Sequence, residues 1–326
     1  TLAPLDSLVG SVLDVSDFAS PALEAGKVDG QLFGIPLGLS ALSLIYDETA
    51  FERYGVAPPT PETTWEEQAE IGLAITEAAR SAGVQNYYGL PDEGGGDYVF
   101  EVWVTQRGGL LYTADGKLGF TEADLAEWLA YWDELRKSGA CVPPDLQALN
   151  KQTIETMALT LGYSPVAYAV ANQLIGFQAV NQGTLSLTMA PRFADATSSG
   201  QALRPSQFFS LGAGSQSLEQ GARFIDFFTR DPEAAAILGV ERGVPPSAAT
   251  RDAIAPQLDA VGRKMVDYIS LVTDRAGPTP PPPPAGATEV AQVLRTANEE
   301  VGFGQKRAAD AARDFMSEAN SVLSRG

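Results

Sequence analysis

Apolar residues between positions 29 and 51 fall into two short runs. Gly34, Pro36 and Gly38 interrupt the first run, whereas the second, from position 41 to 46, is apolar apart from Ser43. Short apolar runs bounded by glycine and proline are typical of buried strands. The pattern predicts two consecutive strands followed by a helix. A strand that continues past such a break often passes from one lobe of a protein into another.

Three capping boxes mark the starts of predicted helices. In a capping box a Ser or Thr side chain caps the helix, and an acid or amide three residues later bonds back to it. The pairs are Thr64 with Glu67, Thr121 with Asp124, and Ser217 with Gln220. We expect a helix to begin at each pair.

Large side chains of the second of these helices share one face. A stripe of this kind is core far more often than a platform for a ligand. Trp65, at the start of the first helix, is expected to pack as well. The residues of the stripe are Leu125, Trp128, Leu129 and Trp132.

The alternation of strands and helices indicates an α/β fold with helices covering the strands. A chain of 326 residues is long enough for two domains. Residues 278–284 (PTPPPPP) cannot be regular helix and are expected to cross between lobes as polyproline II. Two closing helices, 289–301 and 306–323, are expected after this crossing.

Charge and composition exclude several classes of protein. Lys and Arg number 22 and Asp and Glu 41, which gives a formal net charge of −19. Such a surface repels phosphate backbones and anionic lipids, so we expect neither nucleic acid nor a membrane surface as a partner. No apolar run is long enough to span a membrane.

The chain lacks histidine and has one cysteine, Cys141. No Ser-His-Asp triad, HExxH zinc site or internal disulfide can form, and Cys141 is expected to be buried. Residues 212–214 (GAG) lack the third glycine of a dinucleotide fingerprint and are expected to form a turn. We expect no cofactor and no metal. The possibilities that remain are catalysis by a pair of carboxylates, or no catalysis at all.

Several segments resemble bacterial extracellular solute-binding proteins of family 1, the relatives of the maltose-binding protein. Residues 29–51 are similar to the family pattern DGKxYGIPxxxxxLxLxYN followed by a helix, and residues 4–9 (PLDSLV) to PLDDLV. Residues 222–228 resemble the AAWKFLxFL helix, and residues 241–247 the ERGVPxS loop. The resemblance runs through the whole chain.

The resemblance implies a two-lobed periplasmic-binding-protein fold of type II, with an interlobe hinge and a cleft. Residues 1–40 and 210–276 would build the N-terminal lobe, which lacks the first strands of the family. Residues 41–206 and 277–326 would build the C-terminal lobe. The implied location is periplasmic or extracellular, with a lipid anchor in a segment outside this chain left open.

Candidate ligand contacts lie on four segments that the resemblance places at the cleft. Ser40 ends the strand at the crossing, where relatives carry a polar residue that reaches the sugar. A hydroxyl bonded to its own backbone turn is the alternative. After the glycines 94–96, Tyr98 is expected to stack on a sugar ring, while Asp97 and Glu101 accept bonds from its hydroxyls. A flexible glycine run would allow this placement.

The third segment resembles the wSNQ turn of the family. Val170 stands where the family carries tryptophan, so one stacking surface is lost or moved to Tyr168. Asn172 and Gln173 each carry a donor and an acceptor, which suits adjacent hydroxyls. Capping of a helix by Asn172 is the alternative.

The fourth segment is the returning interlobe strand, with Gln207 and Phe209, near the loop of Arg242. Arg242 could clamp a carboxylate, a sulfonate or a pair of hydroxyls. Pairing of Arg242 with Glu241 or another surface carboxylate is the alternative.

The resemblance implies a monomeric component of an ABC importer that captures a small-molecule carbohydrate by hinge closure and delivers it to membrane permease subunits. Neither the sugar nor its charge can be named from the sequence. A carboxylate-based glycoside hydrolase or lyase is the rival from another class, and a cleft for a peptide or protein is a third hypothesis. Sugar binding without release of a product would separate the first from the other two.

Overall fold

The computed structural model describes residues 1–325, which form two compact units. Unit 1 consists of Thr1–Ala41, Val170–Ile175 and Ala202–Thr279. Unit 2 consists of Leu42–Ala169, Gly176–Gln201 and, among the described residues, 280–325. The expected lobes begin and end close to most of these positions. Residues 170–175 belong to unit 1, which differs from the expected division.

Unit 1 is built around the antiparallel pair β3 (Ile35–Ser40) and β9 (Arg204–Phe209), in which Ile35 lies opposite Phe209 and Ser40 opposite Arg204. A short antiparallel pair, β1–β2, precedes β3. The buried core includes Leu5, Ile35 and Ile225. The remaining elements are η1 (Asp6–Leu8), α1 (Ser20–Glu24), β1 (Lys27–Val28), β2 (Gln31–Leu32), η3 (Ala171–Gln173), α9 (Leu218–Arg230), α10 (Pro232–Leu238), α11 (Ala248–Ile254), η4 (Ala255–Gln257) and α12 (Ala260–Arg275).

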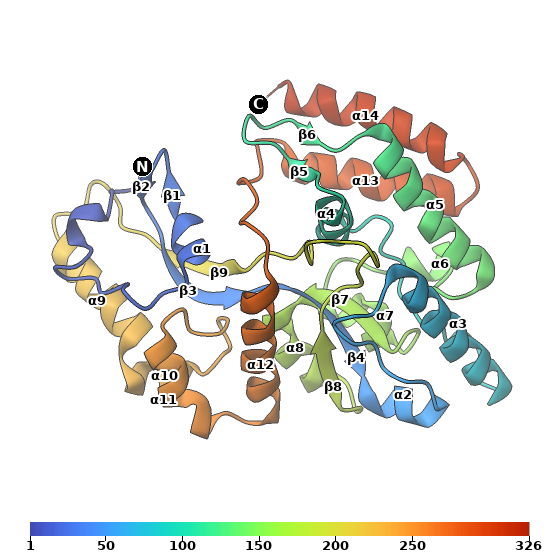
Figure 1. The fold of residues 1–326 in the computed structure, drawn as a ribbon, viewed down its shortest axis with the longest axis horizontal. Coiled ribbons are helices and arrows are strands. Elements are labelled where there is room, and N and C mark those ends of the chain that lie inside the picture. The colour runs from blue at the N-terminus through green and yellow to red at the C-terminus, as the bar shows by residue number, and fades with distance from the viewer. Residues whose placement is uncertain (326) are drawn as a thin grey trace. The chain divides into compact units, whose positions relative to one another are not determined.

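Unit 2 contains a three-stranded sheet in the order β7-β4-β8, with β4 antiparallel to β8. Figure 1 shows α13 and α14 side by side, with α5 next to them. The elements are β4 (Leu42–Asp47), α2 (Glu48–Tyr54), α3 (Trp65–Ser81), α4 (Asp97–Gln106), β5 (Leu110–Tyr112), β6 (Leu118–Gly119), α5 (Glu122–Ser138), α6 (Pro144–Gln147), η2 (Ile154–Thr156), α7 (Ala158–Leu161), β7 (Val166–Val170), α8 (Leu174–Val180), β8 (Leu185–Thr188), α13 (Ala287–Gly302) and α14 (Ala308–Leu323). Unit 1 includes the last residue of β7 and the first two of α8.

Two of the three predicted capping boxes are confirmed. Thr64 caps α3 and Thr121 caps α5, each with both bonds of the box. At Ser217 the predicted helix is confirmed, because α9 begins at Leu218, but the predicted box is wrong, because Ser217 (φ −131°, ψ 44°) forms no side-chain cap bond. The closing helices are confirmed as α13 and α14, and residues 276–284 carry neither helix nor strand.

The predicted aromatic core is confirmed in unit 2. The stripe of α5 is buried, and the ring of Trp65 packs edge-on against Trp128 with centroids 5.9 Å apart. Cys141 is buried as expected, and burial raises the pKa of its thiol. No helix among residues 1–325 is long and apolar enough to cross a membrane.

Hydrogen bonds hold neighbouring segments together where the chain leaves each unit. In unit 1 the Ala171 N–H donates to the Ala41 carbonyl at 2.9 Å, next to the pair of Ser40 with Arg204. In unit 2 the Ser43 hydroxyl donates to the Ala169 carbonyl at 2.8 Å, and the Gln201 amide donates to the Leu42 carbonyl. The chain passes from one unit to the other at 41–42, 169–170 and 201–202. The passage at 41–42 is therefore hydrogen-bonded to both of the others.

Candidate functional site

In unit 1 the loop of Arg242 lies against the end of β3. The Leu39 N–H donates to the Val244 carbonyl at 2.7 Å, and the Val244 N–H returns a bond of 3.0 Å. A Cβ on Gly38 would lie only 2.3 Å from the Arg242 carbonyl oxygen, and the Ser206 hydroxyl of β9 donates to that same oxygen. Gly243, at φ +98°, completes this close approach of backbone to backbone. Because residue 38 is a glycine, the backbone of the Arg242 loop can pack directly against β3.

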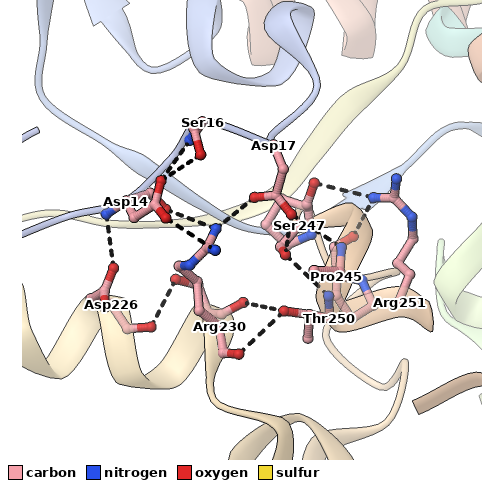
Figure 2. Close-up of polar contacts among 12 residues, drawn as sticks. Asp14, Ser16, Asp17, Asp226, Arg230, Pro245, Ser247, Thr250 and Arg251 are labelled. Carbon is pink, nitrogen blue, oxygen red and sulfur yellow. Dashed lines mark hydrogen bonds and ion pairs between the residues drawn. The ribbon is translucent and has the colours of Figure 1, made fainter. Parts of the chain in front are cut away.

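A polar network holds the other side of this loop, as Figure 2 shows. The Ser247 hydroxyl and the Ala249 N–H donate to Asp17 Oδ2 at 2.7 and 3.1 Å, and Arg230 Nη1 donates to Asp17 Oδ1. Arg251 Nη1 donates to the Pro245 carbonyl at 2.8 Å. The loop is therefore anchored by α9, α11 and the segment before α1.

Asp17 is ionised by its partners. Burial would raise the pKa of Asp17, but the bonds from Ser247, Ala249 and Arg230 outweigh that effect and lower it to about 2. The carboxylate therefore stays charged at neutral pH and continues to accept bonds from the start of α11.

Ser40 and Asn172 meet in unit 1, one residue along β3 from the contact of Leu39 with this loop. The buried Ser40 hydroxyl donates to Asn172 Oδ1 at 3.0 Å, which differs from the alternative of a bond to its own turn. Gln173 Oε1 accepts from the Val170 N–H at 3.3 Å, so this oxygen caps η3. The site thus brings together two residues that the sequence analysis named on segments far apart along the chain.

The other predicted residues of unit 1 differ in their surroundings. Arg242 is exposed, and among the described residues it forms no ion pair with Glu241 or any other carboxylate. Gln207 is exposed on β9. The ring of Phe209 packs edge-on against Phe228 of α9 with centroids 5.0 Å apart, which is a packing contact. A cavity of about 20 Å³ next to Arg242 has room for about one water molecule and is too small for a sugar.

In unit 2 the glycines before α4 are closely packed, which is a correction to the expected flexible run. A Cβ on Gly94 would lie 2.1 Å from Asn298 Oδ1, and one on Gly95 would lie 3.0 Å from the Arg295 Cα. The Gly94 carbonyl accepts from Trp128 Nε1 at 2.8 Å. Glycine is needed here because the backbone approaches α13, and the start of α4 is therefore held in a fixed place.

Tyr98 is half exposed in the first turn of α4, with 51% of its surface accessible. Asp97 and Glu101 are one helical turn apart and partly buried on the same helix. Burial, followed by the charges of Asp97 and Glu101, raises the pKa of Tyr112 to about 12, which places this phenol close to both carboxylates. We call the group of Asp97, Tyr98, Glu101 and Tyr112 the polar corner of unit 2; the ring of Tyr98 is its accessible aromatic surface.

Glu93 belongs to this corner and was missed by the sequence analysis. Burial, and then the charges of Asp92 and Asp97, raise the pKa of Glu93 to about 8. Its carboxyl group lies over Gly96, where a Cβ would come within 2.5 Å of Oε2. Its position directly before the glycine run was the available indication in the sequence. At neutral pH this group is mostly a neutral acid that can donate a hydrogen bond.

Tyr168 is placed in the core of unit 2. The residue is 5% exposed, and its hydroxyl accepts a bond from the Gln68 amide. Burial raises the pKa of this phenol. Its ring therefore does not supply the stacking surface expected in place of the tryptophan at Val170. Trp103 is also buried and packs against Trp65.

The chain matches known proteins over most of its length. The family described as "Bacterial extracellular solute-binding protein" matches residues 2–260. An extracellular solute-binding protein family 1 from Alicyclobacillus acidocaldarius is 30% identical with a TM-score of 0.83, over 99% of this chain and 79% of that one. A periplasmic solute-binding protein from Pectobacterium atrosepticum is 20% identical with a TM-score of 0.83, over 99% and 80%. A periplasmic oligogalacturonide-binding protein from Yersinia enterocolitica, in complex with saturated digalacturonic acid, is 19% identical with a TM-score of 0.83, over 99% and 80%.

The mixed α/β architecture agrees with these structures, which confirms the fold class that the sequence predicted. The chain belongs to the bacterial extracellular solute-binding proteins.

Proposed function

We propose that this protein captures a sugar or sugar-like solute for an ABC importer and binds it without chemical change. Membership of the family supports a small-molecule ligand and a permease partner, outside the cytoplasmic membrane. The Yersinia protein of the same fold was solved with digalacturonic acid, which supports a carbohydrate. The proposed ligand is therefore a hydroxyl-rich molecule.

The observation that carries this proposal is the bond between Ser40 and Asn172 in unit 1, with the Arg242 loop bonded to the neighbouring residue Leu39. The hydroxyl and the amide already bond to each other at 3.0 Å, so their donors and acceptors lie at the spacing of neighbouring sugar hydroxyls. The anchored loop offers Arg242 as an exposed guanidinium for a hydroxyl pair or a carboxylate. We propose Gln173 and Gln207 as further polar contacts.

Unit 2 is proposed to contribute an aromatic contact. Tyr98 would cover the apolar face of a sugar ring, and its half-exposed ring is the surface available for this. Asp97 and Glu101 would accept bonds from hydroxyls, and Glu93 would donate one. Tyr168 and Phe209 pack within their own units, so we assign them to the support of the fold.

The proposed mechanism is hinge closure. A ligand that contacts both units stabilises the closed form by its differential affinity for that form, and a permease would recognise the closed form. Small-angle scattering with and without the bound sugar tests this step. Tight binding with an unchanged radius of gyration would contradict hinge closure.

A glycoside hydrolase is the second candidate, because Glu93 has the raised pKa that a general acid needs. A thermal-shift screen of neutral and acidic sugars, followed by analysis of each mixture for products, separates the two. A bound ligand at a thousandfold excess over Kd stabilises the protein by about 4 kcal/mol. We expect stabilisation and full recovery of the sugar. Cleavage that Glu93→Gln abolishes would favour the hydrolase instead.

A further inference from the structure

A groove in unit 2 lies where α5 and α13 end and α14 begins, at a distance in sequence from the contacts proposed above. Its volume is about 880 Å³, and Arg136, Lys137, Pro144, Gly302 and Lys306 are among its lining residues. Small-molecule sites span roughly 300–1,000 Å³. Figure 1 shows the three helices together at this part of the unit. The groove is large enough for a small organic molecule.

Arg136 carries unused donors at the floor of this groove. Its side chain is 5% exposed, and Nη1 donates to Asp92 Oδ2 at 2.6 Å and to Asn298 Oδ1 at 3.0 Å. Within residues 1–325, Nε and Nη2 have no hydrogen-bond partner. These two nitrogens form the side-on edge of the guanidinium, which matches the two oxygens of a carboxylate. Asp92 already pairs with the charge, but leaving two buried N–H donors without an acceptor is costly, so a ligand that accepts from them gains affinity.

Gly302 borders this edge of Arg136. A Cβ on Gly302 would lie 3.5 Å from Arg136 Nε and 3.2 Å from Pro144 Cγ, so glycine places only a hydrogen atom where a methyl group would touch the guanidinium. The N-terminus of α14 also borders the groove, and its N-cap residue Arg307 forms no side-chain cap bond. The uncapped N–H groups add positive potential.

Charges at the rim favour an anion of low charge. Lys137 pairs with Asp133 at 2.7 Å, and Arg307 pairs with Asp310 at 2.7 Å, so these cations are already neutralised. Glu134 adds a further negative charge to the lining. A doubly charged phosphate would be repelled by these acids more strongly than a single carboxylate.

We propose that this groove binds a small organic acid through one carboxylate group, held by Nε and Nη2 of Arg136. Each of the two nitrogens has less than 1 Å² exposed, so the side chains beside Gly302 would have to move for a ligand to reach them. The residues that line the groove are not among the sugar contacts proposed above.

The test is nuclear magnetic resonance of the Arg136 Nε–H group in the whole chain, titrated with sodium acetate at constant ionic strength. We expect a saturable shift with acetate, an affinity for inorganic phosphate lower by about tenfold, and no saturable shift with chloride. Equal shifts with chloride, or tighter binding of phosphate, would overturn the proposal. No saturable shift with acetate would assign the two donors to an ordered water and would overturn it as well.

Gly302→Ala is the variant of choice, because Arg136→Lys would also break the bonds to Asp92 and Asn298. The added methyl group fills the space beside Nε with only a small adjustment of Pro144. We expect the affinity for acetate to fall about tenfold with little change in Tm. Gly214→Ala is the control, since a Cβ there meets nothing within 4 Å. Unaltered acetate binding in Gly302→Ala would contradict the assigned position.

Discussion

Asp17 and Ser247 are 230 positions apart in the sequence and share a hydrogen bond of 2.7 Å. The bond joins the segment before α1 to Ser247, the N-cap residue of α11. Figure 2 shows that Arg230 of α9 also bonds to Asp17. The Arg242 loop ends at Ser247. The bond between Asp17 and Ser247 therefore helps to hold Arg242, a proposed ligand residue, in place.

Asp17→Asn is expected to destabilise unit 1 by about 2 kcal/mol, because it removes the charge that accepts three hydrogen bonds. The folded pKa is lowered from 3.8 to about 2, so the stabilisation is complete above pH 3.8 and is lost as the pH falls towards 2. Urea unfolding at several pH values measures this. Equal stability of wild type and variant at neutral pH would contradict it, and Asp14→Asn, which is more exposed, is the control.

Gly38→Ala is expected to weaken sugar binding and to destabilise the protein by about 1–3 kcal/mol, because overpacked backbone must move. The new methyl group would lie 2.3 Å from the Arg242 carbonyl oxygen. Calorimetric binding and thermal unfolding measure both effects. Gly214→Ala is a matched control with open space around the new atom, and similar behaviour of the two variants would show that the loop does not depend on Gly38.

Tyr98→Ala is expected to weaken sugar binding at least about tenfold, since stacking contributes on the order of 1 kcal/mol beyond the buried area. The Tm of the free protein should hardly change, because the ring is 51% exposed. Ile237→Ala, at a residue 88% exposed in unit 1, is the control for loss of an exposed apolar side chain. Unchanged affinity, or early unfolding of the free variant, would assign Tyr98 to packing.

Glu93→Gln should alter the pH dependence of stability. The pKa of Glu93 rises from 4.5 to about 8 on folding, so the native protein binds the proton more tightly than the unfolded chain does. Stability of the wild type therefore falls as the pH rises from about 4.5 to about 8, and glutamine removes this loss. We expect the variant to gain Tm relative to wild type over that range. Parallel curves for the two proteins would show that Glu93 titrates normally.

Local patterns predicted the fold better than they predicted the site. The boxes at Thr64 and Thr121 form because their bonds join residues three positions apart, which a sequence displays directly. Ser217 carries the same pattern but adopts a different backbone conformation, which the pattern does not encode. The likeness of its strand to a family turn makes Tyr168 one possible stacking residue, yet its hydroxyl bonds to Gln68, 100 positions away.

The glycines 94–96 show the same limit. Composition suggested flexibility, whereas the packing partners are Arg295 and Asn298 on α13, which no local pattern connects to them. The raised pKa of Glu93 comes mainly from burial, which only the folded chain provides. The bond between Ser40 and Asn172 likewise joins residues 132 positions apart.

The neighbouring passages at 41–42, 169–170 and 201–202 have a mechanical consequence. A single connecting strand would allow torsion as readily as bending, whereas bonded neighbours form a band that resists torsion and shear along its width. The bonds of Ala41 with Ala171 and of Leu42 with Gln201 tie this band on both sides of the first passage. In the proposed closure such a band would favour rotation about one axis, while Ser40 and Asn172, which belong to the same unit, would keep their bond.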